Sequence, residues 1–201
     1  MNIGMGFKRQ EVPVDPAIVA RGLRDAMSGA KPLLSEDDAK AALTQLKTEV
    51  NAKMQAQQQA MQAKSHEEAA GNKKLGDEFL SANKTKDGVV SLPSGLQYKI
   101  LKEGTGPKPT ASDTVSCNYK GTLIDGTEFD SSYKRGEPAS FPVSGVIKGW
   151  TEALQLMPVG SKWQLFIPSD LAYGDPGRPG IAPGSTLIFE VELLSIAEQK
   201  K

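Results

Sequence analysis

The sequence predicts an α+β protein, in which an all-α N-terminal region precedes a C-terminal domain with an antiparallel sheet curved over one short helix. Residues 15–82 contain few glycines and almost no runs of β-branched residues, which is typical of helix. From residue 88 onwards, short stretches alternate between apolar and polar side chains and are separated by Gly and Pro, which is typical of half-buried strands. One stretch within this second region, residues 149–157, follows helical spacing instead.

The first expected helix begins at Asp15-Pro16, where an N-cap residue is followed by a proline that suits the first helical position. Val19, Leu23 and Met27 then recur every four residues. The helix is expected to end at Ser28-Gly29, because glycine is favoured just beyond a helix C-terminus.

A second helix is expected to begin at Ser35, because Ser35 and Asp38 resemble a capping box. A continuous helix over residues 35–82 would be about 70 Å long at ~1.5 Å per residue. Its middle, NAKMQAQQQAMQAKSHEEAAGNKK, consists almost entirely of strong helix formers with little to bury. We interpret it as a rigid solvated stalk that Gly71 and Gly76 could bend or interrupt; the alternative is a flexible low-complexity linker.

The apolar residues of the N-terminal region are too few to form a stable core in a single copy. They are Val19, Leu23, Met27, Leu33, Leu34, Leu43 and Leu46. Pairing with a second copy would bury them, so we expect a homodimer through residues 1–50. The expected divisions are a dimerisation region at 1–34, the stalk at 35–82 and the C-terminal domain at 83–201.

Four strands are expected in the C-terminal domain, at residues 96–101, 114–121, 161–167 and 186–196. The short helix between them has an apolar face made of Trp150, Ala153, Leu154 and Met157. A helix of about two turns is not stable alone in water. We therefore expect it to lie against the sheet, with Trp150 between helix and sheet.

Composition excludes several classes of function. The 24 Lys and Arg residues balance the 24 Asp and Glu residues and no basic cluster is visible, so we expect no nucleic-acid partner. No apolar run approaches the ~20 residues that cross a bilayer, so we expect no membrane span. A single cysteine, Cys117, excludes an internal disulfide, and the single histidine, His66, lies in a polar tract. We therefore expect no metal, no cofactor and no Ser-His or Cys-His catalysis.

The first sixteen residues, MNIGMGFKRQEVPVDP, do not have the pattern of a secretory signal, because the basic pair Lys8-Arg9 follows the apolar residues. Two expectations remain open: a cytoplasmic protein, or a mature N-terminus preceded by an added Met.

Four blocks in the C-terminal domain support a resemblance to a known family. The ordered blocks YKGTLIDGTEFDSS, VIKGWTEALQLMPVGSKW, IPSDLAYG and PGIAPGSTLIFEVELLSI resemble the FKBP-type peptidyl-prolyl cis-trans isomerases over residues 88–197. The segments ARGLRDAMSGAKPLLSEDD and GDEFLSANKTKDGVVSLPSGLQYKI further resemble the Mip-like (macrophage infectivity potentiator) bacterial branch. This resemblance implies a helical dimerisation module, a long connecting helix and a C-terminal FKBP domain, which together form a V-shaped dimer.

The resemblance also implies the residues of the binding pocket. They are Tyr119, Phe129, Asp130, Phe141, Val146, Ile147, Trp150, Tyr173, Ile181 and Phe189. Of these, Asp130, Tyr173, Trp150 and Phe189 are implied as catalytic and the other six as substrate-binding. Trp150 would form the pocket floor, and the Tyr173 hydroxyl and Ile147 N–H would donate hydrogen bonds to substrate carbonyls.

Three positions leave alternatives open. Asp130 is expected to be either a structural partner of Tyr119 or Arg178, or an electrostatic contact of the rotating carbonyl; a role in proton transfer is disfavoured. Ala139 stands where the family often has an aromatic residue, and Arg178 stands where it often has histidine. Both departures concern substrate preference and inhibitor affinity.

The implied function is prolyl isomerisation in unfolded or partly folded proteins, with associated chaperone activity. Proline-containing peptides, unfolded proteins and macrolides of the rapamycin type are the implied ligands. The alternative is a non-enzymatic dimeric holdase or a partner-binding module. The resemblance favours the periplasm or the bacterial cell surface, with the missing signal attributed to trimming, and the cytoplasm is the alternative.

Overall fold

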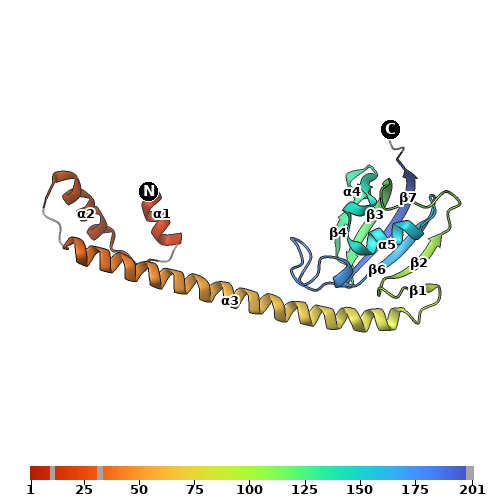
Figure 1. The fold of residues 1–201 in the computed structure, drawn as a ribbon, viewed down its shortest axis with the longest axis horizontal. Helices are drawn as coiled ribbons and strands as arrows, with labels where there is room; N and C mark the ends of the chain where they lie inside the picture. Colours follow the sequence, from red (N-terminus) through yellow and green to blue (C-terminus); the bar gives the residue numbers. More distant parts are fainter. Residues whose placement is uncertain (10–11, 31–33, 198–201) are drawn as a thin grey trace. The chain divides into compact units, whose positions relative to one another are not determined.

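The computed structural model describes residues 1–9, 12–30 and 34–197. The chain divides into two compact units, Met1–Gln62 and Ala63–Lys201. The first unit is helical, and the second contains a sheet and the final turns of the long helix (Figure 1). Leu33, one of the apolar residues expected in a dimer interface, lies outside the described residues.

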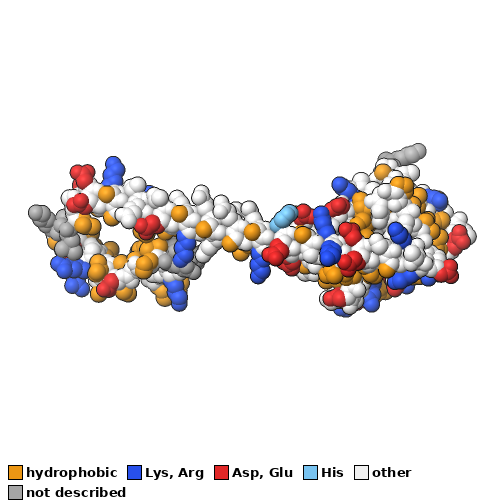
Figure 2. Space-filling model, turned by 90° about the horizontal axis from the view of Figure 1, so that it is seen from below, with side chains coloured by type: hydrophobic (Ala, Val, Ile, Leu, Met, Phe, Trp, Pro, Cys, Tyr) orange, Lys and Arg blue, Asp and Glu red, His pale blue; other side chains and the backbone are white. Residues whose placement is uncertain are grey.

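The N-terminal unit exposes apolar side chains. It contains α1 (Asn2–Arg9), which was not predicted, and α2 (Pro16–Ser28). The predicted start of α2 is confirmed, because the Asp15 carboxylate accepts a hydrogen bond from the Ala17 N–H at 2.7 Å. Leu23 is 60% exposed and Met27 is 82% exposed. Figure 2 shows hydrophobic side chains gathered on the surface of these helices.

The long helix α3 (Glu36–Asn83) is continuous through the polar tract. Ser35 caps its start, since the Ser35 hydroxyl accepts a hydrogen bond from the Asp38 N–H at 3.1 Å and donates one to Asp38 Oδ2 at 2.6 Å. Neither Gly71 nor Gly76 interrupts it. The side chains of residues 51–64 are exposed, as a solvated stalk requires, but the last turns are partly buried against the sheet domain.

The C-terminal unit is built on an antiparallel seven-stranded sheet in the order β1-β2-β6-β7-β3-β4, with β5 paired to β3. The strands are β1 (Val89–Ser91), β2 (Gln97–Lys102), β3 (Thr114–Leu123), β4 (Glu128–Ser131), β5 (Ala139–Pro142), β6 (Lys162–Ile167) and β7 (Leu187–Ile196). The four expected strands are confirmed with bounds that differ by at most two residues. The short strands β1, β4 and β5 were missed, because three or four residues carry too little alternation to detect.

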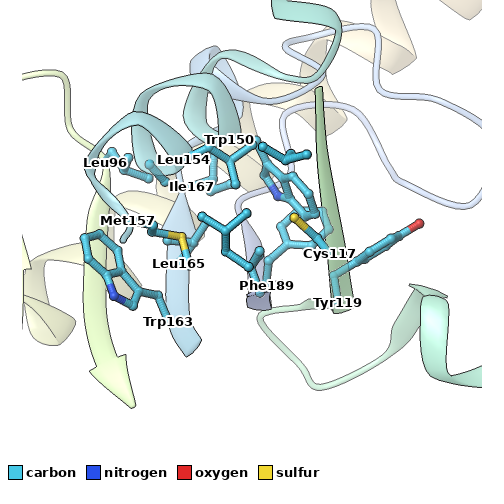
Figure 3. Packing of buried hydrophobic residues seen from close by; sticks show 14 of the residues in the cluster. Leu96, Cys117, Tyr119, Trp150, Leu154, Met157, Trp163, Leu165, Ile167 and Phe189 are labelled. Carbon is cyan, nitrogen blue, oxygen red and sulfur yellow. The ribbon is translucent and has the colours of Figure 1, made fainter. Parts of the chain in front are cut away.

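One face of this sheet packs on α5 (Lys148–Leu156), as the sequence predicts. Trp150 and Leu154 of α5 pack against alternate buried residues of β3, β6 and β7 (Figure 3). The remaining short elements are α4 (Ser132–Arg135), η1 (Val143–Gly145) and η2 (Ser169–Leu171). This core fixes the floor of the site described below.

The last turns of α3 pack against residues of β2 and β6. The rings of Phe79 and Phe166 are 6.0 Å apart between centroids. Gln97 donates a hydrogen bond to the Leu80 carbonyl at 2.9 Å and accepts one from the Asn83 amide at 3.0 Å. Phe166 is therefore buried beside this helix.

Two glycines allow the backbones to approach closely here. A Cβ at Gly76 would collide with the Thr186 hydroxyl, and a Cβ at Gly184 would collide with the Ala69 carbonyl. A Cβ at Gly71 would have no neighbouring side chain or other segment of the chain within 4 Å. The absence of a side chain at Gly76 therefore serves packing between α3 and the segment before β7.

Candidate active site

A cavity of about 410 Å³ opens on the C-terminal unit, within the part of the chain that the structure describes. Its lining residues are Tyr119, Phe129, Asp130, Phe141, Gly145, Val146, Ile147, Trp150, Tyr173, Arg178 and Phe189. Nine of the ten site residues expected from the sequence are in this set. The tenth, Ile181, is 4% exposed and belongs to the core beneath the loop that carries Arg178.

Aromatic side chains from four elements meet around Trp150. Its ring centroid lies 5.3 Å from those of Tyr119 and Phe189 and 5.7 Å from that of Phe141, with interplanar angles of 81–87°. Such edge-to-face pairs stabilise one another beyond the area they bury. Trp150 is only 4% exposed yet lines the cavity, so the indole lies at its floor and is not sealed beneath other side chains.

Gly121 of β3 makes room for part of this wall. A Cβ at Gly121 would come within 2.7 Å of both the Phe129 and the Phe189 rings. Without that atom the two rings meet edge to face at 5.5 Å between centroids. The wall therefore depends on a residue without a side chain as well as on aromatic residues.

The cavity has one hydrogen-bonded charge pair on its wall. The Tyr119 hydroxyl donates to Asp130 Oδ2 at 2.7 Å and accepts from Arg135 Nη2 at 2.6 Å. Arg135 Nη1 also donates to Asp130 Oδ1 at 2.7 Å. The expected partnership of Asp130 with Tyr119 is confirmed. Its charged partner is Arg135 of α4 and not Arg178.

These contacts keep the Asp130 carboxylate ionised. Burial raises the pKa of Asp130, but the hydrogen bonds from Tyr119 and Arg135 together lower it more, so the pKa lies below its ordinary value. Burial raises the pKa of Tyr119, so its hydroxyl remains protonated and donates. An aspartate held in this state is poorly suited to exchange a proton near neutral pH.

Several hydrogen-bond donors at the cavity have no partner among the described residues, including the Tyr173 hydroxyl, the backbone N–H of Ile147 and the indole N–H of Trp150. Ile147 is the N-cap of α5, and its carbonyl accepts from the Trp150 and Thr151 N–H groups at 2.9 and 3.0 Å. The start of this helix therefore fixes the peptide unit while its N–H stays available to a ligand.

The loop between β6 and β7, which contains Tyr173, is attached to α3. Lys73 Nζ lies 3.0 Å from Asp170 Oδ1 and 2.6 Å from Asp175 Oδ1. Asn72 Nδ2 donates to the Pro183 carbonyl at 2.8 Å. These contacts join both ends of the loop to one stretch of α3. The sequence did not indicate them, because this part of the helix has few apolar residues that could pack.

Outside the cavity, the other candidates for chemistry are inactive in this arrangement. Cys117 is buried and free, and burial raises the pKa of its thiol to about 12. Among the described residues no group of three or more His, Cys, Asp and Glu is placed to hold a metal ion. No helix in the described ranges has the length and apolar character needed to cross a membrane.

Sequence reasoning missed Gly145, which lines the cavity, and Arg135, which pairs with Asp130. Arg135 lies five residues after Asp130, and α4 with the Gly136 turn brings it back to the aspartate. Nothing in the sequence pattern indicates that return. Arg178 was noted as a departure from the family pattern and as a candidate partner of Asp130, and the structure places it in the lining of the cavity.

The cavity is walled by aromatic side chains and carries hydrogen-bond donors without partners, and the comparisons with known proteins show the family to which such a chain belongs. The family described as FKBP-type peptidyl-prolyl cis-trans isomerase matches residues 106–194, and the domain amino terminal to that isomerase matches residues 1–100. The chain belongs to the family of FKBP-type peptidyl-prolyl cis-trans isomerases and is an enzyme of that class.

Relatives match almost the whole chain. The outer membrane protein MIP of Legionella longbeachae is 51% identical over 196 residues, which cover 97% of this chain and 81% of the relative. The FKBP-type 22 kDa peptidyl-prolyl cis-trans isomerase of Escherichia coli is 47% identical over 182 residues, covering 90% and 83%. The crystal structure of FkpA from Escherichia coli has a TM-score of 0.67 and 41% identity, covering 97% of this chain and 89% of that chain.

Proposed function

We propose that the aromatic cavity catalyses rotation about X-Pro bonds by removing the peptide from water and holding its carbonyls while the bond twists. The observation that carries this proposal is the pairing of an aromatic floor at Trp150 with two unengaged donors, the Tyr173 hydroxyl and the Ile147 N–H. Asp130, Phe189 and the other lining residues complete the wall.

The physical basis is amide resonance. Resonance gives the C–N bond partial double-bond character and a barrier of ~18–20 kcal/mol. The planar amide is more dipolar than the twisted one, so water favours the planar form and an apolar cavity favours the twisted form. Each ~1.4 kcal/mol of such a difference accelerates the reaction tenfold. No nucleophile, metal or proton donor takes part in this step.

Peptide and refolding measurements test this proposal together. We expect the chain to accelerate isomerisation of a short peptide with leucine before proline, and a refolding reaction limited by proline. Replacing Trp150, Tyr173 and Phe189 together should abolish both effects, with circular dichroism verifying the fold. Unchanged rates in this variant would overturn the assignment of the cavity.

We also propose that the chain forms a homodimer through residues 1–50. The support is the apolar surface of α2, where Ile18, Leu23 and Met27 are 60–82% exposed in a single copy. Such a surface is unfavourable in water unless a partner covers it. The family match over residues 1–100 agrees with a dedicated N-terminal module.

Sedimentation analysis tests the dimer. A variant with Leu23→Glu and Met27→Glu should sediment as a monomer, because two carboxylates would be buried at the interface. Met61→Glu, on an exposed position of α3 outside residues 1–50, is the matched control and should remain dimeric. A monomeric wild-type chain at micromolar concentration would refute this proposal.

The same apolar surface favours an accompanying chaperone activity in which the dimer holds unfolded chains by multivalent contact. Suppression of aggregation should survive replacement of Trp150, Tyr173 and Phe189, and should be lost on deletion of residues 1–62. We place the protein in the bacterial periplasm or at the cell surface, in line with the name of its Legionella relative, outer membrane protein MIP. Macrolides of the rapamycin type are the inhibitors we expect to compete for the cavity.

A further inference from the structure

Two charged side chains line the cavity, and they differ in how their charge is balanced. Both carboxylate oxygens of Asp130 accept hydrogen bonds, from Tyr119 and from Arg135. Arg178 has no carboxylate within ion-pair distance among the described residues. The acidic residues of its loop, Asp170 and Asp175, lie outside the lining and are bound by Lys73.

A tight turn holds Arg178 at the cavity. The Arg178 N–H donates to the Ile181 carbonyl at 3.0 Å and the Ile181 N–H donates to the Arg178 carbonyl at 2.8 Å. Pro179 and Gly180 occupy the two central positions, and Gly180 has a φ of +86°, as a type II turn requires. Ile181 is buried in the core, so the turn is anchored from below.

The guanidinium is also oriented. Its Cζ lies 4.6 Å from the centroid of the Tyr173 ring, in the arrangement of a cation–π contact. This contact keeps the charge beside the residue that is proposed to hold the substrate carbonyl. The guanidinium edge remains able to pair with a carboxylate, since stacking uses only the face of the group.

We propose that Arg178 makes the enzyme favour an acidic residue over a neutral residue of the same size directly beside the proline of the substrate. The proposal rests on the proposed function of the cavity and specifies the substrate class that the site prefers. A peptide whose proline lies over Trp150 places the neighbouring side chains at the rim, where Arg178 is the unneutralised charge. Opposite charges about 4 Å apart in water attract enough to change binding by about fivefold.

The test compares glutamate with glutamine, which differ in charge but not in size. One set of peptides carries Glu, Gln or Leu before the proline, and a second set carries the same residues after it. The ratio of kcat/KM for Glu over Gln should be about threefold to tenfold higher in the wild type than in Arg178→Gln, in at least one set. In Arg178→Glu the ratio should fall below one, and Arg178→Lys should retain part of the preference.

Salt and a control variant separate charge from structure. At about 1 M salt, where the Debye length is ~3 Å, the wild-type ratio should approach that of Arg178→Gln. Lys108→Gln removes an exposed positive charge that does not line the cavity and should keep the wild-type ratio. Equal Glu/Gln ratios in wild type and Arg178→Gln in both sets would overturn the inference if the wild type still accelerates the leucine peptide. Failure on the leucine peptide itself would overturn the proposed function of the cavity.

Discussion

Two tyrosine hydroxyls at the cavity have different roles in the structure. The Tyr119 hydroxyl both donates and accepts within the wall, through Asp130 and Arg135. The Tyr173 hydroxyl has no such partner in the described part of the chain. Removing the Tyr119 hydroxyl therefore breaks hydrogen bonds within the protein, whereas removing the Tyr173 hydroxyl breaks only a hydrogen bond to a bound ligand.

Tyr173→Phe should therefore lower kcat/KM on a leucine-proline peptide by about tenfold, the value of one hydrogen bond of ~1.4 kcal/mol. The melting temperature should stay within about 1 °C of the wild type, because no internal hydrogen bond is lost. Tyr133→Phe, at an exposed tyrosine outside the cavity, is the control and should leave activity unchanged. A large loss of stability in Tyr173→Phe would show that its hydroxyl supports the fold.

Asp130 makes the free energy of unfolding depend on pH. Its folded pKa lies below the ordinary value of 3.8, so its ionised form stabilises the fold above pH 4 and this stabilisation is lost as pH falls through the folded pKa. Asp130→Asn should lower the free energy of unfolding by about 1 kcal/mol at pH 7. The difference from wild type should shrink toward zero below pH 3. Urea unfolding at both pH values measures this, with the exposed Asp87→Asn as the control.

At the scale of elements, the sequence predicted the strands and the helix whose apolar residues recur with a regular period. β3 and β7 alternate over ten residues each and were found, and the apolar face of α5 was found from Trp150 and Leu154. The packing of α3 on the sheet was not predictable, because its buried contacts are an alanine, a glycine, an asparagine and one leucine. Where small residues let two backbone segments approach closely, the sequence shows no periodic apolar pattern that would reveal the contact.

The two glycines of α3 test this packing as a matched pair. Gly76→Ala places a methyl group against the Thr186 hydroxyl and should destabilise the fold by about 1–3 kcal/mol. Gly71→Ala meets no atom within 4 Å and should stabilise it by about 0.5–1 kcal/mol, since alanine is the better helix former. Urea denaturation of both variants measures the difference. Stabilisation by both would mean that α3 does not pack there in solution.

At the scale of the whole molecule, the compact C-terminal unit begins at Ala63, which is inside α3 and well before the domain boundary that the sequence suggested at residue 83. The boundary at residue 83 remains a prediction, which truncated chains can test. A fragment of residues 63–201 keeps Lys73, Phe79 and Leu80, whereas a fragment of residues 84–201 loses all three.

The longer fragment should be the more stable by about 3 kcal/mol, because the shorter one exposes Phe166 and leaves Gln97 without its partners. The longer fragment should also keep full activity on short peptides, since it contains every residue that lines the cavity. Urea midpoints and peptide isomerisation rates compare the two fragments. Equal midpoints would restore the boundary at residue 83.

The buried thiol of Cys117 has a consequence for the behaviour of the folded chain in an oxidising solution. With its pKa raised to about 12, the sulfur at neutral pH is almost entirely uncharged, and thiolate is the form that attacks disulfides. The folded chain can therefore pass through an oxidising environment without mixed disulfides or covalent cross-links between copies. A protein with an exposed cysteine thus finds no reactive sulfur on the folded chain with which to form a disulfide.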